Sequence, residues 1–296
     1  MPDIAIKQLS RLLMSHTKAR IHSSLLALLL VSALEPARAQ ADTTQSVPLF
    51  TAGDAVLGGA VLVGALLARR LDERISLRIQ DSSTQANAKL HLVSTVVRTT
   101  AAPGALIIGT TMYAAGRLSK EQHLEALGLH GTEALILGEV VGGVIKGVIG
   151  RQRPFVKPQN SHSFGFLRGF GGGDEYRSFP SGHTLAAFAA AATVTSETSG
   201  WWPQTRWVIG PALYTGATFT GLSRMYDNRH WASDVIVGAG IGTFAGLKVV
   251  RYVNAHQNRV DKLLLTASVV PLTGGGHTVH WSLLPGAALP SGPRVH

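Results

Sequence analysis

Six long apolar stretches constrain what this chain of 296 residues can fold into. Each stretch exceeds ten residues and is rich in alanine or leucine, which favours helix over strand. In the last of them Gly238, Gly242 and Gly246 recur every four residues and leave a bare stripe that a neighbouring helix can approach closely. The sequence therefore predicts an all-α protein, a bundle of about six core helices over residues 52–68, 100–116, 132–150, 183–197, 207–222 and 233–253.

The composition limits the kind of protein and its partners. Hydrophobic residues make up 45% and charged residues 15%, which is rich for a soluble protein and lean for one that spans a membrane many times. The absence of cysteine excludes a disulfide framework, cysteine metal sites and thiol catalysis. A net charge of +10 suits nucleic acid, anionic lipid or a phosphate-bearing substrate. No basic helix carries interleaved aromatic residues, so nucleic acid is not expected as a partner.

The N-terminal residues 1–41 are predicted to be an export signal peptide. Lys18 and Arg20 precede an apolar run from Leu25 to Leu34, and small residues suited to cleavage follow at 37–41. This run is too short for a hydrocarbon core of roughly 30 Å, which needs about 20 residues. An uncleaved membrane anchor is the alternative.

Two further regions are predicted after the signal. Residues 42–260 form one helical domain, and residues 261–296 form a C-terminal tail or a short β-hairpin. Two β-prone runs, Leu263–Val270 and Thr278–Leu283, flank the glycine-rich segment Thr273–Gly276, a pattern that fits a small hairpin and leaves a loose tail as the alternative.

A first motif, Lys146 followed seven residues later by Arg153-Pro154, closes the third apolar stretch. If the helix continues to Arg153, both cations lie on one face, and Pro154 ends the helix. Two cations buried without partners are costly, and a bound anion would remove that cost. Taken alone, the motif is explained better by solvated basic residues at a helix C-terminus, which suit the negative end of the helix dipole.

A second motif, Pro180-Ser181-Gly182-His183, opens the alanine-rich fourth stretch. Glycine lets a backbone approach an anion, and free N–H groups at a helix start point toward it. His183 is able to give a proton to a leaving group near neutral pH. An ordinary Pro-Ser helix start with an incidental histidine is the alternative.

A third motif contains Ser223-Arg224, His230 and Asp234. If the chain is helical from His230 onward, His230 and Asp234 are i,i+4 neighbours on one face. The carboxylate then holds one imidazole nitrogen protonated and leaves the other free to attack phosphorus. Arg224 offers a planar fork that matches phosphate oxygens. A solvated His–Asp pair on a helix surface is the alternative.

All three motifs fall at predicted helix ends. They lie at the end of the third helix, at the start of the fourth, and between the fifth and the sixth. In an up-down bundle these ends share one face. The sequence therefore predicts a pocket for a phosphate group that already contains a nucleophile and an acid.

The ordered set KxxxxxxRP, PSGH and SRxxxxxHxxxD resembles the pattern of the type 2 phosphatidic acid phosphatases, bacterial non-specific acid phosphatases and vanadium haloperoxidases. The chain matches this pattern at every defining position, and the resemblance covers about residues 50–253. It implies a helical bundle and a phosphatase that needs neither metal nor cofactor. The implied substrates are phosphate monoesters or pyrophosphates, either of lipids such as phosphatidate and polyprenyl pyrophosphate or of small soluble compounds.

The resemblance also implies roles for individual residues. His230 attacks phosphorus to form a phosphohistidine, Asp234 orients it, and His183 protonates the leaving oxygen. The implied phosphate-binding set is Lys146, Arg153, Ser181, Gly182 and Arg224. Vanadate is expected to bind in the same pocket.

Two other functions remain open. The haloperoxidase branch, whose chains are generally longer, uses the same pocket for vanadate-dependent halide oxidation. A phosphate- or lipid-binding protein without catalytic activity would also keep the pocket.

Two locations also remain open. A cleaved signal would place residue 42 outside the cell membrane and make six crossings hard to reconcile with an outward-facing pocket. An exported periplasmic domain that associates with the membrane surface is therefore favoured, and an integral inner-membrane protein is the alternative.

Overall fold

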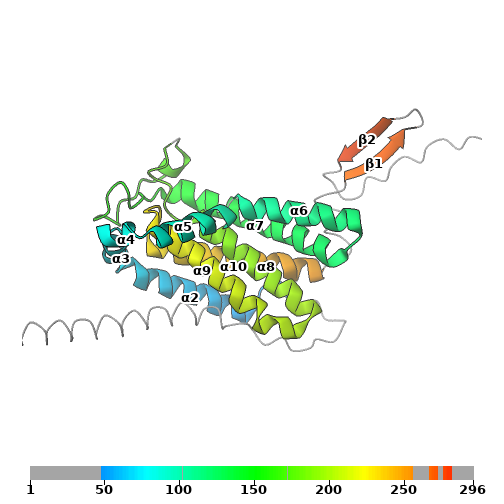
Figure 1. The fold of residues 1–296 in the computed structure, drawn as a ribbon, viewed down its shortest axis with the longest axis horizontal. Coiled ribbons are helices and arrows are strands. Elements are labelled where there is room, and N and C mark those ends of the chain that lie inside the picture. Colours follow the sequence, from blue (N-terminus) through cyan, green and yellow to red (C-terminus); the bar gives the residue numbers. More distant parts are fainter. Residues whose placement is uncertain (1–47, 102, 172, 256–266, 273–275, 282–296) are drawn as a thin grey trace, which may run out of the picture.

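The computed structural model describes residues 48–101, 103–171, 173–255, 267–272 and 276–281, so the predicted signal peptide lies outside the described residues. Helices dominate these ranges, as the sequence predicted (Figure 1). The α-helices are α2 (Ala52–Arg69), α3 (Asp72–Ile79), α4 (Ser82–Gln85), α5 (Ala88–Ala101), α6 (Gly104–Ser119), α7 (Gln122–Ile149), α8 (Gly182–Trp201), α9 (Ile209–Tyr226) and α10 (Ala232–Ala255). Two 3₁₀ turns, η1 (Arg168–Phe170) and η2 (Pro203–Trp207), lie in the connections.

Helices α8 and α10 form the centre of the bundle (Figure 1). The glycine stripe predicted on α10 faces α8, where a Cβ atom at Gly238 or Gly242 would overlap the backbone carbonyl oxygen of Ser181 or Leu185. Leu185 and Ala189 of α8 are fully buried. The small residues therefore bring the two backbones together, and this contact fixes the start of α8 beside the start of α10.

The second predicted helix is wrong in extent. Instead of one helix over 100–116, the chain forms α5 and α6, and Pro103 caps the start of α6. Helix α5 was not predicted because Lys89, His91, Arg98 and several threonines interrupt its apolar pattern. Helix α7 likewise begins ten residues earlier than expected, at Gln122, since its first turns carry polar side chains.

Two antiparallel strands, β1 (Ala267–Leu272) and β2 (Gly276–Trp281), lie in the region for which a tail or a short hairpin was predicted. Their register pairs Ala267 with Trp281 and Leu272 with Gly276.

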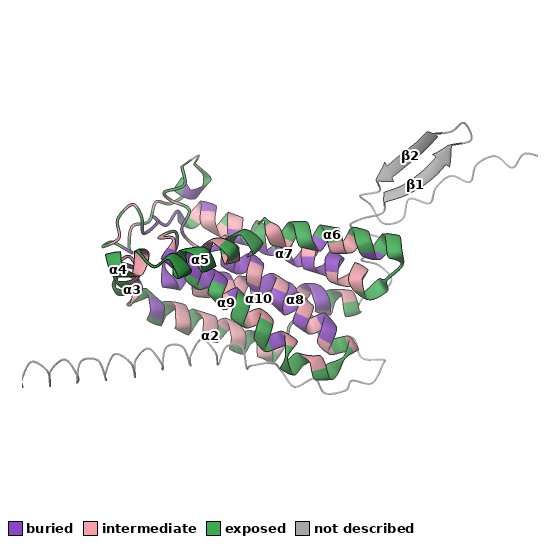
Figure 2. Cartoon of the chain, in the orientation of Figure 1, coloured by how far each residue is buried: buried purple, intermediate pink, exposed green. Residues whose placement is uncertain are grey.

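The bundle has exposed outer faces on α5, α6 and α7 (Figure 2), and many of the residues exposed there are large and apolar. By length and composition α2 and α10 are each able to cross a membrane, and α5 with α6, bent by 45°, would make a third crossing. The exposed set includes Leu62, Val63, Leu66 and Leu67 of α2, Leu106, Ile107 and Ile108 of α6, and Ile136, Val140, Val141 and Val144 of α7.

Candidate active site

The three sequence motifs meet at one end of the bundle. Helix α7 ends there, α8 and α10 begin there, and α9 ends there with Arg224 in its last turn. The loop between α7 and α8 and the short helix α3 lie at the same end (Figure 1). The expected convergence of helix ends is therefore present, although the individual contacts differ from the predicted ones in three places.

The first difference concerns Lys146 and Arg153, which do not share a helix face. Helix α7 stops at Ile149, and Gly150 follows in the left-handed conformation with φ of +54°. A side chain there would be strained and would overlap the carbonyl oxygen of Gly165, so glycine ends the helix before Arg153 is reached. Arg153 approaches the site from the loop instead.

Both cations of the first motif still point into the site. The Lys146 ammonium donates to the carbonyl oxygen of Pro180 at 2.9 Å, directly before α8. Arg153 is buried, and its Nη1 lies 3.5 Å from Nε2 of His230. Asp174 holds the other side of this guanidinium, with its carboxylate 2.8 Å from Nη2. The loop therefore presents Arg153 to the free edge of the His230 ring.

The second difference concerns His230 and Asp234. Helix α10 begins at Ala232, so His230 precedes it and the two side chains are not a helical i,i+4 pair. The closest approach of Nδ1 to the Asp234 carboxylate is 3.9 Å, whereas Nδ1 lies 2.6 Å from the carbonyl oxygen of Ser178. Asp234 instead accepts from the Trp231 N–H at 2.9 Å and from the Ser178 hydroxyl at 2.5 Å. A carboxylate in the first turn that accepts from the N–H of the residue preceding the helix stabilises the helix start.

This geometry fixes the tautomer of His230. A carbonyl oxygen only accepts hydrogen bonds, so Nδ1 carries the proton and Nε2 keeps its lone pair. His230 is 4% exposed, and burial, together with Arg153 and Lys146, lowers its pKa to about 3. The ring is therefore neutral at physiological pH, with a nucleophilic nitrogen facing a guanidinium.

The third difference concerns the start of α8. The Ser181 N–H, expected to bind phosphate, donates to the backbone carbonyl oxygen of Asp234 at 3.1 Å, and the Ser181 hydroxyl bonds to Thr184 at 2.8 Å. The N–H therefore joins α8 to α10 and is not available to a ligand, while the hydroxyl is engaged with the first turn of α8. Gly182 is the first residue of α8, so its N–H has no acceptor within the helix.

Arg224 and His183 complete the group. Arg224 is 6% exposed and bonds Asp227 through Nη1 at 2.7 Å, while its Nε is buried without a hydrogen-bond partner in the described part of the chain. A buried guanidinium nitrogen without an acceptor is costly, and an anion in the site would supply one. Burial lowers the pKa of His183 to about 4, with further contributions from Arg224, Lys146 and Arg153.

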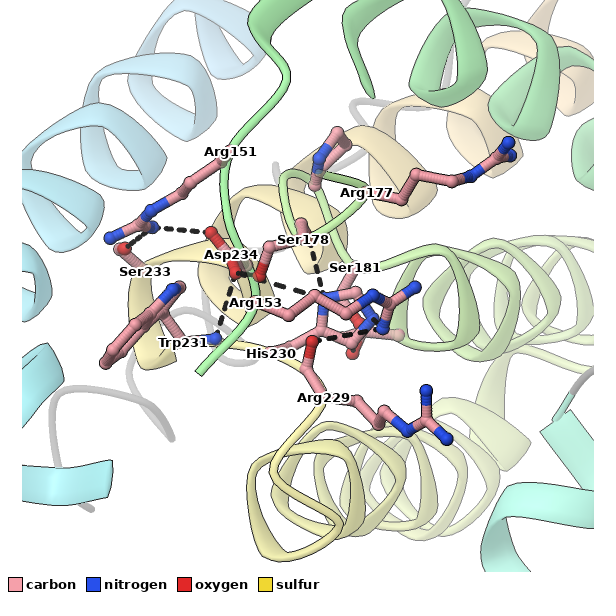
Figure 3. Close-up of polar contacts among 12 residues, drawn as sticks. Arg151, Arg153, Arg177, Ser178, Ser181, Arg229, His230, Trp231, Ser233 and Asp234 are labelled. Carbon is pink, nitrogen blue, oxygen red and sulfur yellow. Dashed lines mark hydrogen bonds and ion pairs between the residues drawn. The ribbon is translucent and has the colours of Figure 1, made fainter. Parts of the chain in front are cut away.

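Four residues of the site were not predicted: Asp72, Arg151, Asp174 and Ser178. Arg151 lies inside the first motif, and a buried arginine beside an apolar helix would have been the signal to look for carboxylates. Figure 3 shows Arg151 on one side of Asp234, and Ser178 between Asp234 and His230. Within the described ranges no three histidine, aspartate or glutamate side chains are grouped to hold a metal, so no metal ligand is assigned.

Comparisons with known proteins agree with the resemblance seen in the motifs. Residues 129–258 match the model of the PAP2 superfamily. A lipid A 1-phosphatase of Porphyromonas gingivalis is 47% identical over 85 residues, which are 29% of this chain and 18% of the relative. The aligned part is thus a small share of that relative's length.

Two solved structures resemble the chain. One is the transmembrane PAP2 type phosphatidylglycerolphosphate phosphatase of Bacillus subtilis, with a TM-score of 0.53 and 20% identity over 70% of this chain and 98% of that chain. The other is LpxE of Aquifex aeolicus, with a TM-score of 0.45 and 22% identity over 62% of this chain and 96% of that chain. The first likeness shows a shared fold.

The site predicts binding of a tetrahedral oxyanion. Vanadate should bind the purified protein, and Arg224→Gln should weaken binding roughly 10- to 100-fold, the loss expected for one hydrogen bond to a charged group. Arg206→Gln, on the exposed turn η2, is the matched control and should bind like the parent chain. Titration calorimetry measures the three affinities, and equal affinities for all three proteins would contradict this description of the pocket.

Proposed function

We propose that the chain is a phosphatase of the PAP2 superfamily, whose model matches residues 129–258, and that it hydrolyses phosphate esters through a phosphohistidine on His230. The observation that carries this proposal is the fixed tautomer of a buried, neutral histidine. Its Nδ1 is tied to the Ser178 carbonyl oxygen, and its Nε2 faces the Arg153 guanidinium. A nucleophile for phosphorus needs this free lone pair next to cations that attract the phosphoryl oxygens.

In the first step Nε2 of His230 attacks phosphorus and the bond from phosphorus to the ester oxygen breaks. His183, at the start of α8, gives its proton to the leaving oxygen. Arg153, Arg224 and Lys146 hold the phosphoryl oxygens and offset the charge that spreads over them in the transition state. The N–H of Gly182 adds a donor at the positive end of α8.

In the second step water attacks the phosphohistidine and the phosphorus–nitrogen bond breaks. His183, now neutral, accepts a proton from the water and is restored as the acid for the next turnover. His230 regains its lone pair while Nδ1 keeps its proton. Inorganic phosphate leaves, and atoms and protons balance over the two steps.

The proposed substrate is a phosphorylated lipid. The outer faces of α2, α6 and α7 expose many large apolar side chains, and α2 and α10 have the length and apolarity of membrane spans. The relative from P. gingivalis is a lipid A 1-phosphatase, and the similar B. subtilis structure is transmembrane. We therefore place the bundle within a membrane, in preference to the membrane-associated soluble domain favoured by the sequence, with the site at the water interface.

The side of the membrane on which the site lies depends on whether residues 1–41 act as an export signal. Export of the site to the periplasmic side stays a prediction that rests on the signal-like sequence of residues 1–41.

Replacing His230 tests the proposed function. His230→Ala should lower kcat on a lipid phosphate at least about 10³-fold, because no other group supplies the attacking nitrogen. His123→Ala is the control, since His123 is exposed and stacks on Trp201 at the opposite end of the bundle. Phosphate release by protein in detergent micelles is the measurement. Turnover that survives in His230→Ala would contradict the proposal, and a parent chain without turnover would favour the silent-binding alternative.

The pH dependence tests the role of His183. In the free site its pKa is lowered to about 4 by burial, Arg224, Lys146 and Arg153, so the acid form is scarce at neutral pH. A bound phosphoryl group is negatively charged and offsets those cations, which raises the pKa of His183 in the complex. The alkaline limb of kcat, which reports the complex, should therefore lie at higher pH than that of kcat/KM, which reports the free protein.

The control for this profile is His183→Asn. It should remove the alkaline limb from kcat while the ionisation of the substrate phosphate still shapes kcat/KM. Limbs that coincide in the parent chain, or a kcat profile unchanged in His183→Asn, would contradict the assigned acid.

A further inference from the structure

Arg151 is a buried cation with no nitrogen left for a substrate. Its side chain is 2% exposed. Nη1 donates to Asp234 Oδ1 at 2.5 Å and to the Ser233 hydroxyl at 2.7 Å. Nη2 donates to Asp72 Oδ2 at 2.8 Å, and both Nη2 and Nε donate to the Ser161 carbonyl oxygen. The guanidinium therefore acts within the protein, unlike Arg153 and Arg224.

Asp72 is the second carboxylate on this guanidinium and comes from α3, outside the part of the chain that matches the family model. It is 1% exposed and accepts from the Ser233 N–H at 2.9 Å and the Ser233 hydroxyl at 2.6 Å. The Cζ atom of Arg151 lies 5.5 Å from the ring centres of both Phe164 and Trp231. Two carboxylates and two aromatic rings thus confine the guanidinium.

The confined guanidinium holds one oxygen of Asp234, so the other oxygen has a fixed direction. That second oxygen accepts from the Ser178 hydroxyl at 2.5 Å. The backbone N–H of Ser178 donates to the carbonyl oxygen of Arg151 at 3.0 Å. Ser178 is fully buried and is held by its side chain and its N–H, which aims its carbonyl oxygen at Nδ1 of His230 (Figure 3).

We propose that Asp72 and Arg151 are positioning residues for the nucleophile, acting through Asp234 and Ser178 to set the tautomer and direction of His230. The inference rests on the proposed function, because positioning matters only if His230 attacks phosphorus. Neither residue touches the substrate. Their loss changes where Nε2 points and which ring nitrogen carries the proton.

A merely structural role makes a different prediction. A clamp that joins α3 to α10 would lower stability when weakened, but the folded fraction would keep its kcat and its histidine tautomer. A positioning role lowers kcat in the folded protein and leaves KM nearly unchanged, because the cations that bind phosphate are untouched.

Asp72→Asn tests the inference, with Asp81→Asn as the matched control on the exposed cap of α4. We expect kcat on a phosphate ester to fall about 10²-fold in Asp72→Asn, the effect of a displacement near 1 Å in a reacting group, with KM within about twofold. Asp81→Asn should match the parent chain. Folding is checked by thermal unfolding, and kcat is expressed per folded molecule.

A second measurement does not depend on turnover. In ¹⁵N-histidine-labelled protein, with His230→Gln used for assignment, the His230 signals should report a proton on Nδ1 in the parent chain and a mixture of tautomers in Asp72→Asn. An active parent chain with an unchanged kcat and tautomer in Asp72→Asn would overturn the inference and leave the proposed function intact. An inactive parent chain would overturn the proposed function instead.

Ser178→Ala keeps the test decisive if Asp72→Asn does not fold. It removes only the hydroxyl that connects Asp234 to the Ser178 backbone and leaves both carboxylates bonded to Arg151. We expect about a tenfold loss of kcat at constant KM. A Ser178→Ala protein with the parent kcat would overturn the inference.

Discussion

The buried contact between Asp234 and Arg151 is the interaction on which the site depends. Asp234 is fully buried, and a carboxylate in such a place is costly unless a cation and hydrogen-bond donors surround it. Arg151 supplies the cation, and the start of α10 and Ser178 supply the donors. These partners come from the loop after α7 and from the start of α10. The hydrogen bonds and the ion pair of Asp234 therefore join the segment that carries Arg153 to the segment that carries His230.

The close packing of α8 on α10 likewise brings the start of α8 to the site. The glycine stripe of α10 places the start of α8 beside Asp234, whose carbonyl oxygen accepts from the Ser181 N–H. At this start of α8, His183 lies within electrostatic reach of Arg224, Lys146 and Arg153. The arrangement of the candidate site is thus a consequence of how the ends of α7, α8, α9 and α10 pack together, while the outer faces of the bundle expose large apolar side chains.

Much of this arrangement follows from the sequence. The apolar stretches predict the helices, and the three motifs predict which ends converge, because their residue types make sense together only around an anion. The details that failed depend in part on contacts distant in the sequence. Gly150 ends α7 early in the left-handed conformation, a role for which glycine is a local signal that the prediction did not use, whereas the approach of the Gly165 backbone is a contact that the sequence does not show.

The pairing of His230 with Ser178 instead of Asp234 has a similar origin. An i,i+4 spacing predicts a direct contact only if the helix starts at His230, and the start of α10 at Ala232 is set by Asp234 accepting from the Trp231 N–H. No signal in the sequence indicated the role of Asp72, because this residue lies in a short amphipathic helix about 80 residues from its partner Arg151.

Trapping the covalent intermediate tests the central claim most directly. A ³²P-labelled lipid phosphate would be mixed with excess protein, quenched in alkali within a single turnover, and the labelled peptide identified. The account predicts an alkali-stable, acid-labile label on the peptide that contains His230, and no label in His230→Gln. Phosphate release at the full single-turnover rate without labelled protein, or a label on another residue, would contradict it.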